Sequence, residues 1–446
     1  MSIEIKVKRG MNIPMKGKPQ TSVEVLPRSK YYAVKPGDFI GINPRLFVQP
    51  GDKVKAGDAL FYSKYQPDVI FTSPVSGTVK EIVRGKRRVI LRVIIEADSN
   101  DEYKTFRTDD SSRDSVMKAL LASGLFPYIK QRPYDIVPSP EDIPSAIYIP
   151  SYDTAPLAPD YSFAMHDYRK EFQRGVDVIN KLTSGKVYLT VDGNGKSFFH
   201  ETENVELIKV YGPHPAGNVS LSIAKTHPVN KGDRLWVIPP WIVVFIGRLF
   251  EKGIVDMHKN VAFAGDMLEN PQYYKLISGA YLNDIMPAKI KKGKNVRIIS
   301  GNPLTGTNIT SDGFMNTADS SVTVLEEGNK ARFFGWMPFF GTSRKTVYRV
   351  DFDWFSNKEK SYDTSLHGEE RPFVMTEEVE EVVPLDIYPV HLLKACLTGD
   401  VDKMEQLGIM EVAPEDFALV DYISSSKINA QNIIRDGLNV MMIEVG

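Results

Sequence analysis

The sequence predicts a multidomain chain that combines α/β and β domains. At about 150 residues per domain, its 446 residues correspond to roughly three domains. Short strands interrupted by frequent Gly and Pro residues fill about the first 100 residues, which favours a small β-sandwich. From about residue 113 strands alternate with helices, which favours a parallel sheet. Helical spacing of apolar residues dominates the C-terminal part of the chain.

The first region begins with a strand pattern. Ile3 and Ile5 alternate with charged residues, which is the period of a half-buried strand. Two Gly-Asp turns punctuate the segment 48–83 and separate short apolar runs. This segment resembles the biotinyl/lipoyl domain, a flattened β-sandwich. We therefore expect residues 1–105 to form a lipoyl/biotinyl-like barrel-sandwich domain.

The biotinyl/lipoyl resemblance leads to an expectation about lysine modification. In that family the acceptor lysine lies on an exposed hairpin, halfway between two flanking turns. Tyr65 to Asp68 occupy that stretch here, with Pro67 near the acceptor position. Lys64 is displaced by about three residues, which we expect to remove its exposure. The sequence therefore predicts no lipoyl or biotin acceptor.

A Rossmann-like α/β domain is predicted for residues 106–258. Strand and helix patterns alternate as in parallel crossovers, with a helix expected at 114–125, helical spacing over 161–182, and strands at 146–149, 186–191 and 205–211. Within the second helical stretch, Phe163, Tyr168 and Phe172 form an aromatic stripe. We expect this stripe to lie in the core.

The next region has the order of a β-grasp unit, with strand patterns on both sides of a short helix expected near 282–286. It resembles the SLBB, or soluble-ligand-binding β-grasp, domain, whose pattern is matched by the segments 265–271 and 301–306. The predicted boundaries are 259–360 for this domain, with added strands from 321 to about 355, and 361–446 for a linker and a C-terminal helical domain.

Composition and charge exclude several classes of function. Lys and Arg total 55 and Asp and Glu total 56, and the resulting net charge of −1 implies no nucleic-acid partner. Because Cys396 is the single cysteine, a disulfide framework, a thiolate zinc site and a four-cysteine iron–sulfur cluster are excluded within this chain. The His residues are scattered, so no metal site is predicted.

The sequence also bears on membrane insertion. The N-terminus has no apolar signal-peptide core. The longest apolar stretch, Trp236 to Phe250, is too short to span a bilayer and contains Pro239, Pro240 and Arg248. We expect no transmembrane helix, so that any membrane association is peripheral.

Two loops follow the carboxyl ends of predicted parallel strands, which is where open α/β sheets bind ligands. The loop 192–195 precedes Lys196 but lacks the third Gly of G-x-G-x-x-G and the GK[ST] of a P-loop, so it predicts a turn and no nucleotide site. The loop Gly212 to Asn218 has a proline on each side of His214, which restricts the backbone. His214 is therefore a candidate ligand-facing residue, and a rigid interdomain turn is the alternative.

The domain order and several strings resemble the A subunit of the Na⁺-translocating NADH:quinone oxidoreductase. These strings are KRGMNIPMKG (8–17), GINPR (41–45), FTSPVSGTV (71–79), RGKRRV (84–89), QRPYDIVP (131–138), GPHPAGN (212–218), ISGNPLTGT (299–307), FFGW (333–336), PLDIYPVHLLKACLTGD (384–400) and APEDFALVDYISSSK (413–427). A more distant resemblance is to the C subunit of the Rnf complex and to the flavoprotein subunit of complex I. Those proteins carry a Gly-rich nucleotide loop or cysteine clusters, which this sequence lacks.

The resemblance implies a peripheral subunit on the cytoplasmic face of the bacterial inner membrane. It implies a sodium-pumping complex of six subunits, with the membrane-embedded B subunit as the chief partner and a contribution to the binding and reduction of quinone, such as ubiquinone. NADH, flavins, iron–sulfur centres and Na⁺ would be handled by other subunits, so this chain is expected to bind no cofactor and to be inactive alone. The alternative is a non-catalytic scaffold or a soluble-ligand-binding protein.

A quinone headgroup needs a mostly apolar, aromatic-lined slot with a few polar groups, and such slots favour domain interfaces. We expect the quinone-facing surface where the N-terminal β domain meets the α/β domain. The candidate residues are Phe39 and Ile40 in one segment and Pro133 and Tyr134 in the other. The alternative is that Phe39 and Tyr134 are interdomain packing residues without a ligand.

Overall fold

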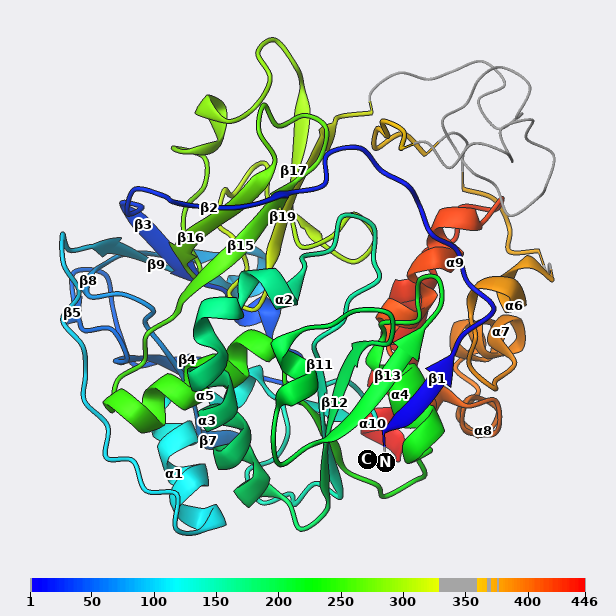
Figure 1. Cartoon of the computed structure of the whole chain (residues 1–446), viewed down its shortest axis with the longest axis horizontal. Helices are drawn as coiled ribbons and strands as arrows, with labels where there is room; N and C mark the ends of the chain where they lie inside the picture. Colours follow the sequence, from blue (N-terminus) through cyan, green and yellow to red (C-terminus); the bar gives the residue numbers. More distant parts are fainter. Residues whose placement is uncertain (1, 329–358, 367–369, 375–376, 446) are drawn as a thin grey trace.

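A computed structural model describes residues 2–328, 359–366, 370–374 and 377–445 (Figure 1). The string 333–336 and most of the added strands expected up to about residue 355 lie outside these residues. The described strands form two six-stranded sheets, one four-stranded sheet and one three-stranded sheet. The mixed α/β and β class predicted from the sequence is therefore confirmed.

The first six-stranded sheet is the predicted Rossmann-like sheet. Its strands, in spatial order, are β1 (Ile3–Lys6), β13 (Glu206–Tyr211), β12 (Lys186–Asp192), β11 (Ala146–Pro150), β14 (Leu235–Val237) and β10 (Lys130–Arg132). All neighbours are parallel except β10, which runs antiparallel to β14. The expected strands at 146–149, 186–191 and 205–211 are thus present, with the parallel crossovers that the pattern predicted.

Alternation along these strands builds a core on each face of the sheet. Ile147 and Leu189 join the core that contains side chains of α1 (Arg113–Ser123), α3 (Arg169–Ile179) and α5 (Pro240–Lys252). Tyr148 and Tyr188 point to the other face, where their rings stack with centroids 5.0 Å apart. That face packs against α4 (Val219–Thr226) and the C-terminal helices.

The C-terminal helices lie on the flank of the sheet that carries β1 and α4 (Figure 1). They are α6 (Glu378–Val382), α7 (Pro389–Thr398), α8 (Val401–Gln406), α9 (Ala418–Ile423) and α10 (Ala430–Glu444). Leu393, Leu438 and Met441 are fully buried in the core that these helices share with the sheet. The helical part of the chain is therefore packed against the α/β domain and completes its second face.

The structure differs from the prediction in the first 25 residues. β1 pairs with β13 in the α/β sheet, and β2 (Gln20–Val25) runs beside β16 in the second six-stranded sheet. The sandwich itself consists of β3 (Tyr31–Val34), β9 (Ile90–Ala97), β8 (Gly77–Arg84) and β5 (Lys53–Val54) facing β4 (Pro44–Leu46), β6 (Ala59–Ser63) and β7 (Gln66–Thr72). An alternating pattern indicates which residues a strand buries, but not which sheet it joins.

The hairpin of β6 and β7 corrects the expectation about Lys64. Its turn consists of Lys64 and Tyr65, and both side chains are exposed. The expectation that displacement removes the exposure of Lys64 was therefore wrong. Pro67 lies inside β7, and not at the turn.

The second six-stranded sheet, called here the SLBB sheet, contains the predicted β-grasp strands. In spatial order they are β18 (Thr307–Asn308), β17 (Val296–Ser300), β19 (Ser321–Glu326), β15 (His258–Ala264), β16 (Gln272–Ile277) and β2. The helix expected near 282–286 is instead a short 3₁₀ turn, Met286–Ala288. Pro287 contributes to this difference because it has no N–H to continue a helix.

The aromatic and apolar stretches also form shorter elements than expected. The helical spacing over 161–182 divides into α2 (Tyr161–Ala164), a 3₁₀ turn, α3 and a second 3₁₀ turn after α3. The apolar run from Trp236 ends β14 and then forms α5, most of which is buried. In the part of the chain that the structure describes, no helix has the length and apolar character needed to cross a bilayer.

Helices α3 and α5 approach each other through two glycines. A Cβ added to Gly175 would lie 2.0 Å from the carbonyl oxygen of Val243, and one added to Gly247 would lie 1.8 Å from that of Glu171. Contacts this short are possible only without a side chain at either position. The two glycines therefore set the distance between the helices, and with it the position of α5.

We predict that Gly247→Ala destabilises the protein. Alanine normally favours a helix over glycine by about 1 kcal/mol. Here the new Cβ overlaps the Glu171 carbonyl, so we expect a net loss of about 1–3 kcal/mol in the free energy of unfolding. Urea denaturation measures this loss. Gly37→Ala is the control, since open space surrounds Gly37; equal stability of the two variants would show that α3 and α5 separate freely.

Candidate functional site

The loop 212–218 lies at the carboxyl edge of the α/β sheet, as predicted, and His214 is buried within it at 3% exposure. The Nδ1 atom of His214 is 3.2 Å from Oγ1 of Thr154, and its amide donates to Oδ1 of Asn12. Its carbonyl oxygen accepts from the amide of Met11 at 2.7 Å. Gly10 packs so closely that a Cβ there would lie 2.2 Å from that oxygen. The loop thus holds the N-terminal segment in place, as expected for a rigid turn.

The two segments predicted to face quinone lie side by side. The amide of Val137 donates to the carbonyl of Ile40 at 3.0 Å. However, Phe39 is buried against Phe71 and Tyr128, with ring centroids 4.6 and 5.2 Å away.

Tyr134 belongs to the other core, shared with the C-terminal helices. Pro133 beside it is also buried, and the carbonyl of Tyr134 accepts from Nη1 of Arg435 in α10 at 2.7 Å. The structure therefore brings the predicted segments together but directs the rings of Phe39 and Tyr134 into separate cores.

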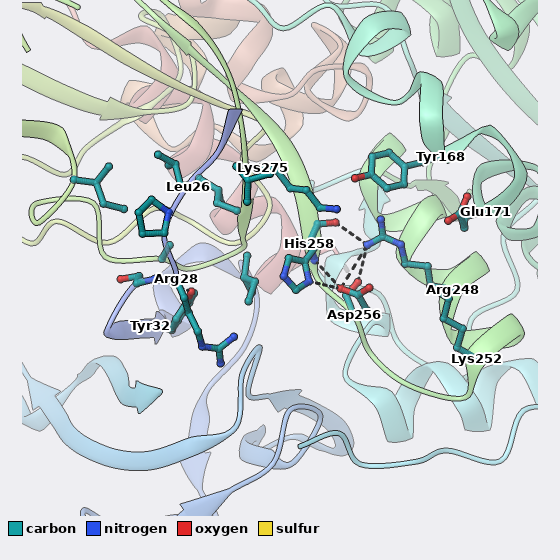
Figure 2. A pocket seen from close by; sticks show the side chains of 17 residues that line it. Leu26, Arg28, Tyr32, Tyr168, Glu171, Arg248, Lys252, Asp256, His258 and Lys275 are labelled. Carbon is teal, nitrogen blue, oxygen red and sulfur yellow. Dashed lines mark hydrogen bonds and ion pairs between the residues drawn. The ribbon is translucent and has the colours of Figure 1, made fainter. Parts of the chain in front are cut away.

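A different cavity opens where the β-sandwich, the α/β domain and the SLBB sheet meet (Figure 2). We call it the junction pocket, and its volume is about 570 Å³. Its lining residues are Val25, Leu26, Pro27, Arg28, Ser29, Tyr32, Tyr168, Glu171, Arg248, Lys252, Asp256, His258, Lys275, Leu276, Ile277, Ala280 and Ile285. One wall is mostly apolar, and the opposite wall carries charged and aromatic side chains.

The charged wall is built around Arg248, which α5 places at 2% exposure. Its Nη1 atom donates to the carbonyl oxygens of Asp256 and His258, at 3.0 and 2.6 Å. Its guanidinium lies over the ring of Tyr168, 4.8 Å from the centroid. These contacts fix the linker between the α/β domain and the SLBB sheet against α5.

Asp256 and His258 form a hydrogen-bonded pair in this linker. Oδ1 of Asp256 lies 2.7 Å from Nδ1 of His258, and the same oxygen accepts from the His258 amide at 3.0 Å. Burial opposes ionisation of the carboxyl, but the hydrogen bond from His258 and the charge of Arg248 outweigh it and hold the pKa of Asp256 well below its usual range. An ionised carboxylate only accepts hydrogen bonds, so Nδ1 of His258 is the donor.

The remaining cations differ in how firmly they are held. Arg28 is engaged by Asp101 through two hydrogen bonds of 2.7 and 2.6 Å and by the carbonyl of Asp98. Lys275 extends from β16 toward His258 and Arg248, and Lys252 lies farther along α5 (Figure 2). Among the residues that the structure describes, the amines of Lys275 and Lys252 have no hydrogen-bond or ion-pair partner.

This arrangement suits a flat ligand that has carbonyl acceptors. The apolar wall and the ring of Tyr168 offer surface for a ring, the ammonium of Lys275 offers a donor, and His258 adds a second polar group. The lining has more cationic than anionic side chains, and this excess of positive charge favours a neutral or anionic ligand over a cation.

Sequence reasoning missed most of this pocket. Tyr168 was expected in the core, and it packs against the core, but its ring also lies next to Arg248 at the pocket wall. Asp256 and His258 carry no motif, and His258 was one of the scattered histidines. The available signal was Arg248 itself, because a charge inside an apolar run requires partners when it is buried.

Comparison with known proteins identifies the family. Three family models match the chain: the "NqrA N-terminal barrel-sandwich hybrid domain" over residues 5–98, the "NqrA second alpha/beta domain" over 111–255 and the "NQRA C-terminal domain", of SLBB type, over 260–311. The A subunit of the Na(+)-translocating NADH-quinone reductase of Yersinia pestis bv. Antiqua is 34% identical over 440 residues, covering 97% of this chain and 98% of its own. This chain belongs to the NqrA family.

Other NqrA relatives agree. Those of Klebsiella pneumoniae and Pasteurella multocida are 34% and 33% identical, covering 95% and 98% of this chain and 96% and 98% of their own. Among solved structures, an NAD⁺-reducing [NiFe]-hydrogenase in the H₂-reduced state covers 75% of this chain and 62% of its own, at 12% identity and a TM-score of 0.41. Asp256 and His258 lie between the matched NqrA α/β and SLBB regions.

We predict that His214 makes folding stability depend on acidity. Burial lowers the pKa of His214 from 6.5 to about 4. The unfolded chain therefore takes up a proton that the folded chain refuses, and stability falls as the pH drops from 6.5 to 4. The shift of about 2.5 units corresponds to about 3 kcal/mol.

The variant His214→Asn removes this titration and retains an acceptor for Thr154. Urea midpoints measured between pH 4 and pH 8 should vary less in this variant than in the wild type. The exposed His166 provides the matched control, because His166→Asn should leave the acid sensitivity unchanged. An equal loss of stability in all three proteins would contradict the prediction.

Proposed function

We propose that this chain acts as the A subunit of a Na⁺-translocating NADH:quinone reductase complex. Its similarity to relatives of that name, over 97% of its length, supports the assignment. In this proposal the chain is a peripheral protein on the cytoplasmic face of the inner membrane, bound chiefly to the membrane-embedded B subunit. It carries no tightly held cofactor, and electrons from NADH arrive through the other members of the complex of six subunits.

The specific role that we propose is to hold the quinone headgroup in the junction pocket. The observation that supports this role is the pairing of an apolar wall with the polar side chains of His258 and Lys275 in one cavity. A quinone is a flat ring with two carbonyl acceptors, and its ring and oxygens require these two kinds of surface. The pocket lies where the β-sandwich, the α/β domain and the SLBB sheet meet, and Phe39, Ile40, Pro133 and Tyr134 are not among its lining residues.

The alternative is that the chain is a scaffold or soluble-ligand-binding protein without a role in quinone reduction. Co-purification separates the two possibilities in part, because a scaffold outside the complex does not recover the membrane-embedded B subunit. Kinetics of the assembled complex separate them fully, because variants of a scaffold leave the quinone KM unchanged.

We predict that Lys275→Met raises the quinone KM of the assembled complex. Methionine keeps the apolar stem and removes the charged donor. A hydrogen bond from a charged group contributes about 1.5 kcal/mol or more, so KM should rise about tenfold. Steady-state rates with a short-chain quinone, with NADH as reductant, provide the measurement.

Two comparisons make this test specific. Lys225→Met changes an exposed lysine on α4, outside the pocket, and should leave KM unchanged. Phe39→Ala and Tyr134→Phe test the other predicted surface, for which Phe39, Ile40, Pro133 and Tyr134 remain the proposed quinone-proximal residues. A rise in KM for Tyr134→Phe with a normal value for Lys275→Met would move the quinone to that surface.

A further inference from the structure

His258 is held on three sides. Its carbonyl accepts from Arg248 at 2.6 Å, and its Nδ1 atom lies 2.7 Å from the carboxylate of Asp256. It is also the first residue of β15 and pairs there with Ile277 of β16. Within the described residues Nε2 of the imidazole has no hydrogen-bond partner, so this edge of the ring is available to a ligand. The side chain is 35% exposed and lines the junction pocket (Figure 2).

The charged and titratable groups around His258 come from every element that borders the pocket. They are Asp256 in the linker, Lys275 on β16, Arg248, Lys252 and Glu171 on α5 and α3, Tyr168 before α3, and Arg28, Tyr32, Asp101 and Tyr103 at the β-sandwich. The carboxylate of Asp256 is in direct contact with the imidazole, 2.7 Å from Nδ1. Asp101 forms an ion pair with Arg28 at 2.6 Å.

Histidine is the side chain that ordinarily changes charge between pH 5 and 8. An imidazole whose one nitrogen is fixed by a carboxylate, and whose other nitrogen faces a ligand cavity, is the arrangement required of a general acid. The carboxylate fixes the orientation of the ring through Nδ1. Asp256 therefore has the geometry of a positioning residue, and His258 that of a proton donor.

We infer that His258 donates a proton through Nε2 to an oxygen of the quinone bound in the junction pocket. This inference rests on the proposed function, in which the two electrons come from NADH through the other subunits. As the quinone oxygen gains electron density, its new O–H bond forms while the Nε2–H bond of the imidazolium breaks. The neutral imidazole keeps its hydrogen bond to Asp256.

The proton balance closes through solvent. Water at the exposed edge returns a proton to Nε2, and the same route supplies the second proton of the quinol. Overall, one quinone takes up two electrons and two protons, and His258 ends the cycle unchanged. The partial exposure of the side chain permits this exchange, which a fully buried histidine would not allow.

The test uses His258→Gln in the assembled complex with a short-chain quinone. Glutamine keeps a donor toward Asp256 but cannot deliver a proton. We expect kcat for quinone reduction at neutral pH to fall about 100-fold, and its dependence on pH to be lost, while KM changes little. Reduction of a soluble acceptor that takes electrons before the quinone step should keep its wild-type rate.

Asp256→Asn tests the positioning role. It should lower kcat by about tenfold and displace the pH profile, because the carboxylate no longer orients and stabilises the imidazolium. His166→Gln removes an exposed histidine outside the pocket and should keep the wild-type profile. Gel filtration of each complex establishes that the subunits have assembled, and His258→Gln decides the question if Asp256→Asn does not assemble.

The outcomes separate this inference from the proposed function. If His258→Gln keeps the wild-type kcat and pH profile while Lys275→Met raises KM, quinone binds in the pocket but His258 is not its donor, and the inference is overturned. If both variants keep wild-type kinetics, the quinone lies elsewhere and the proposed role of the pocket fails as well. If His258→Gln has a low kcat that no longer depends on pH, and His166→Gln keeps the wild-type profile, the inference is supported.

Discussion

The buried guanidinium of Arg248 is the interaction on which the arrangement around the junction pocket depends. A buried cation is costly unless hydrogen bonds and an opposite charge replace the lost water. Arg248 obtains these from the carbonyls of Asp256 and His258 and from the Asp256 carboxylate, 3.7 Å away. Both carbonyls belong to the linker between the α/β domain and the SLBB sheet. The hydrogen bonds that Arg248 needs therefore also fix the position of His258, the first residue of β15. The close approach of α3 and α5 at Gly175 and Gly247 determines where that charge lies.

Local sequence signals predicted those helices and strands that are defined by interactions between residues close together in the sequence. Helix α1 begins after Ser112, whose side chain accepts from the amide of Ser115, and it ends at Gly124 in the left-handed conformation. The central strands of the α/β sheet follow from short buried runs between helices. By contrast, the sheets that β1 and β2 join were not predictable, because strand periodicity reports burial and not the partner strand. The prediction for Lys64 was wrong for a related reason. It counted residues from the flanking turns, whereas the exposure of Lys64 depends on the position of the hairpin turn between β6 and β7.

The candidate site was harder to predict than the fold, because its residues are separated in the sequence. Tyr168, Arg248 and His258 meet only after the linker folds back against α5. Phe39 and Tyr134 illustrate the opposite difficulty. Aromatic residues next to Gly or Pro fit a ligand slot and a packed turn equally well, and the structure places both rings in cores. The feature that distinguishes the pocket in the sequence is the charge of Arg248 within the apolar helix α5, which requires partners when buried. An aromatic pattern does not distinguish it.

The position of the pocket has a further physical consequence. Its walls come from the β-sandwich, from α3 and α5, and from the SLBB sheet, so a ligand that fills it contacts all of these units. A ligand that binds only the assembled arrangement stabilises that arrangement by mass action. The linkage also operates in reverse, because a shift of the SLBB sheet relative to α5 would move His258 and Lys275 away from Tyr168 and weaken binding. The carbonyl contacts of Arg248 restrain this motion, and the guanidinium that forms one wall of the pocket is thus also the group that keeps the pocket preorganised.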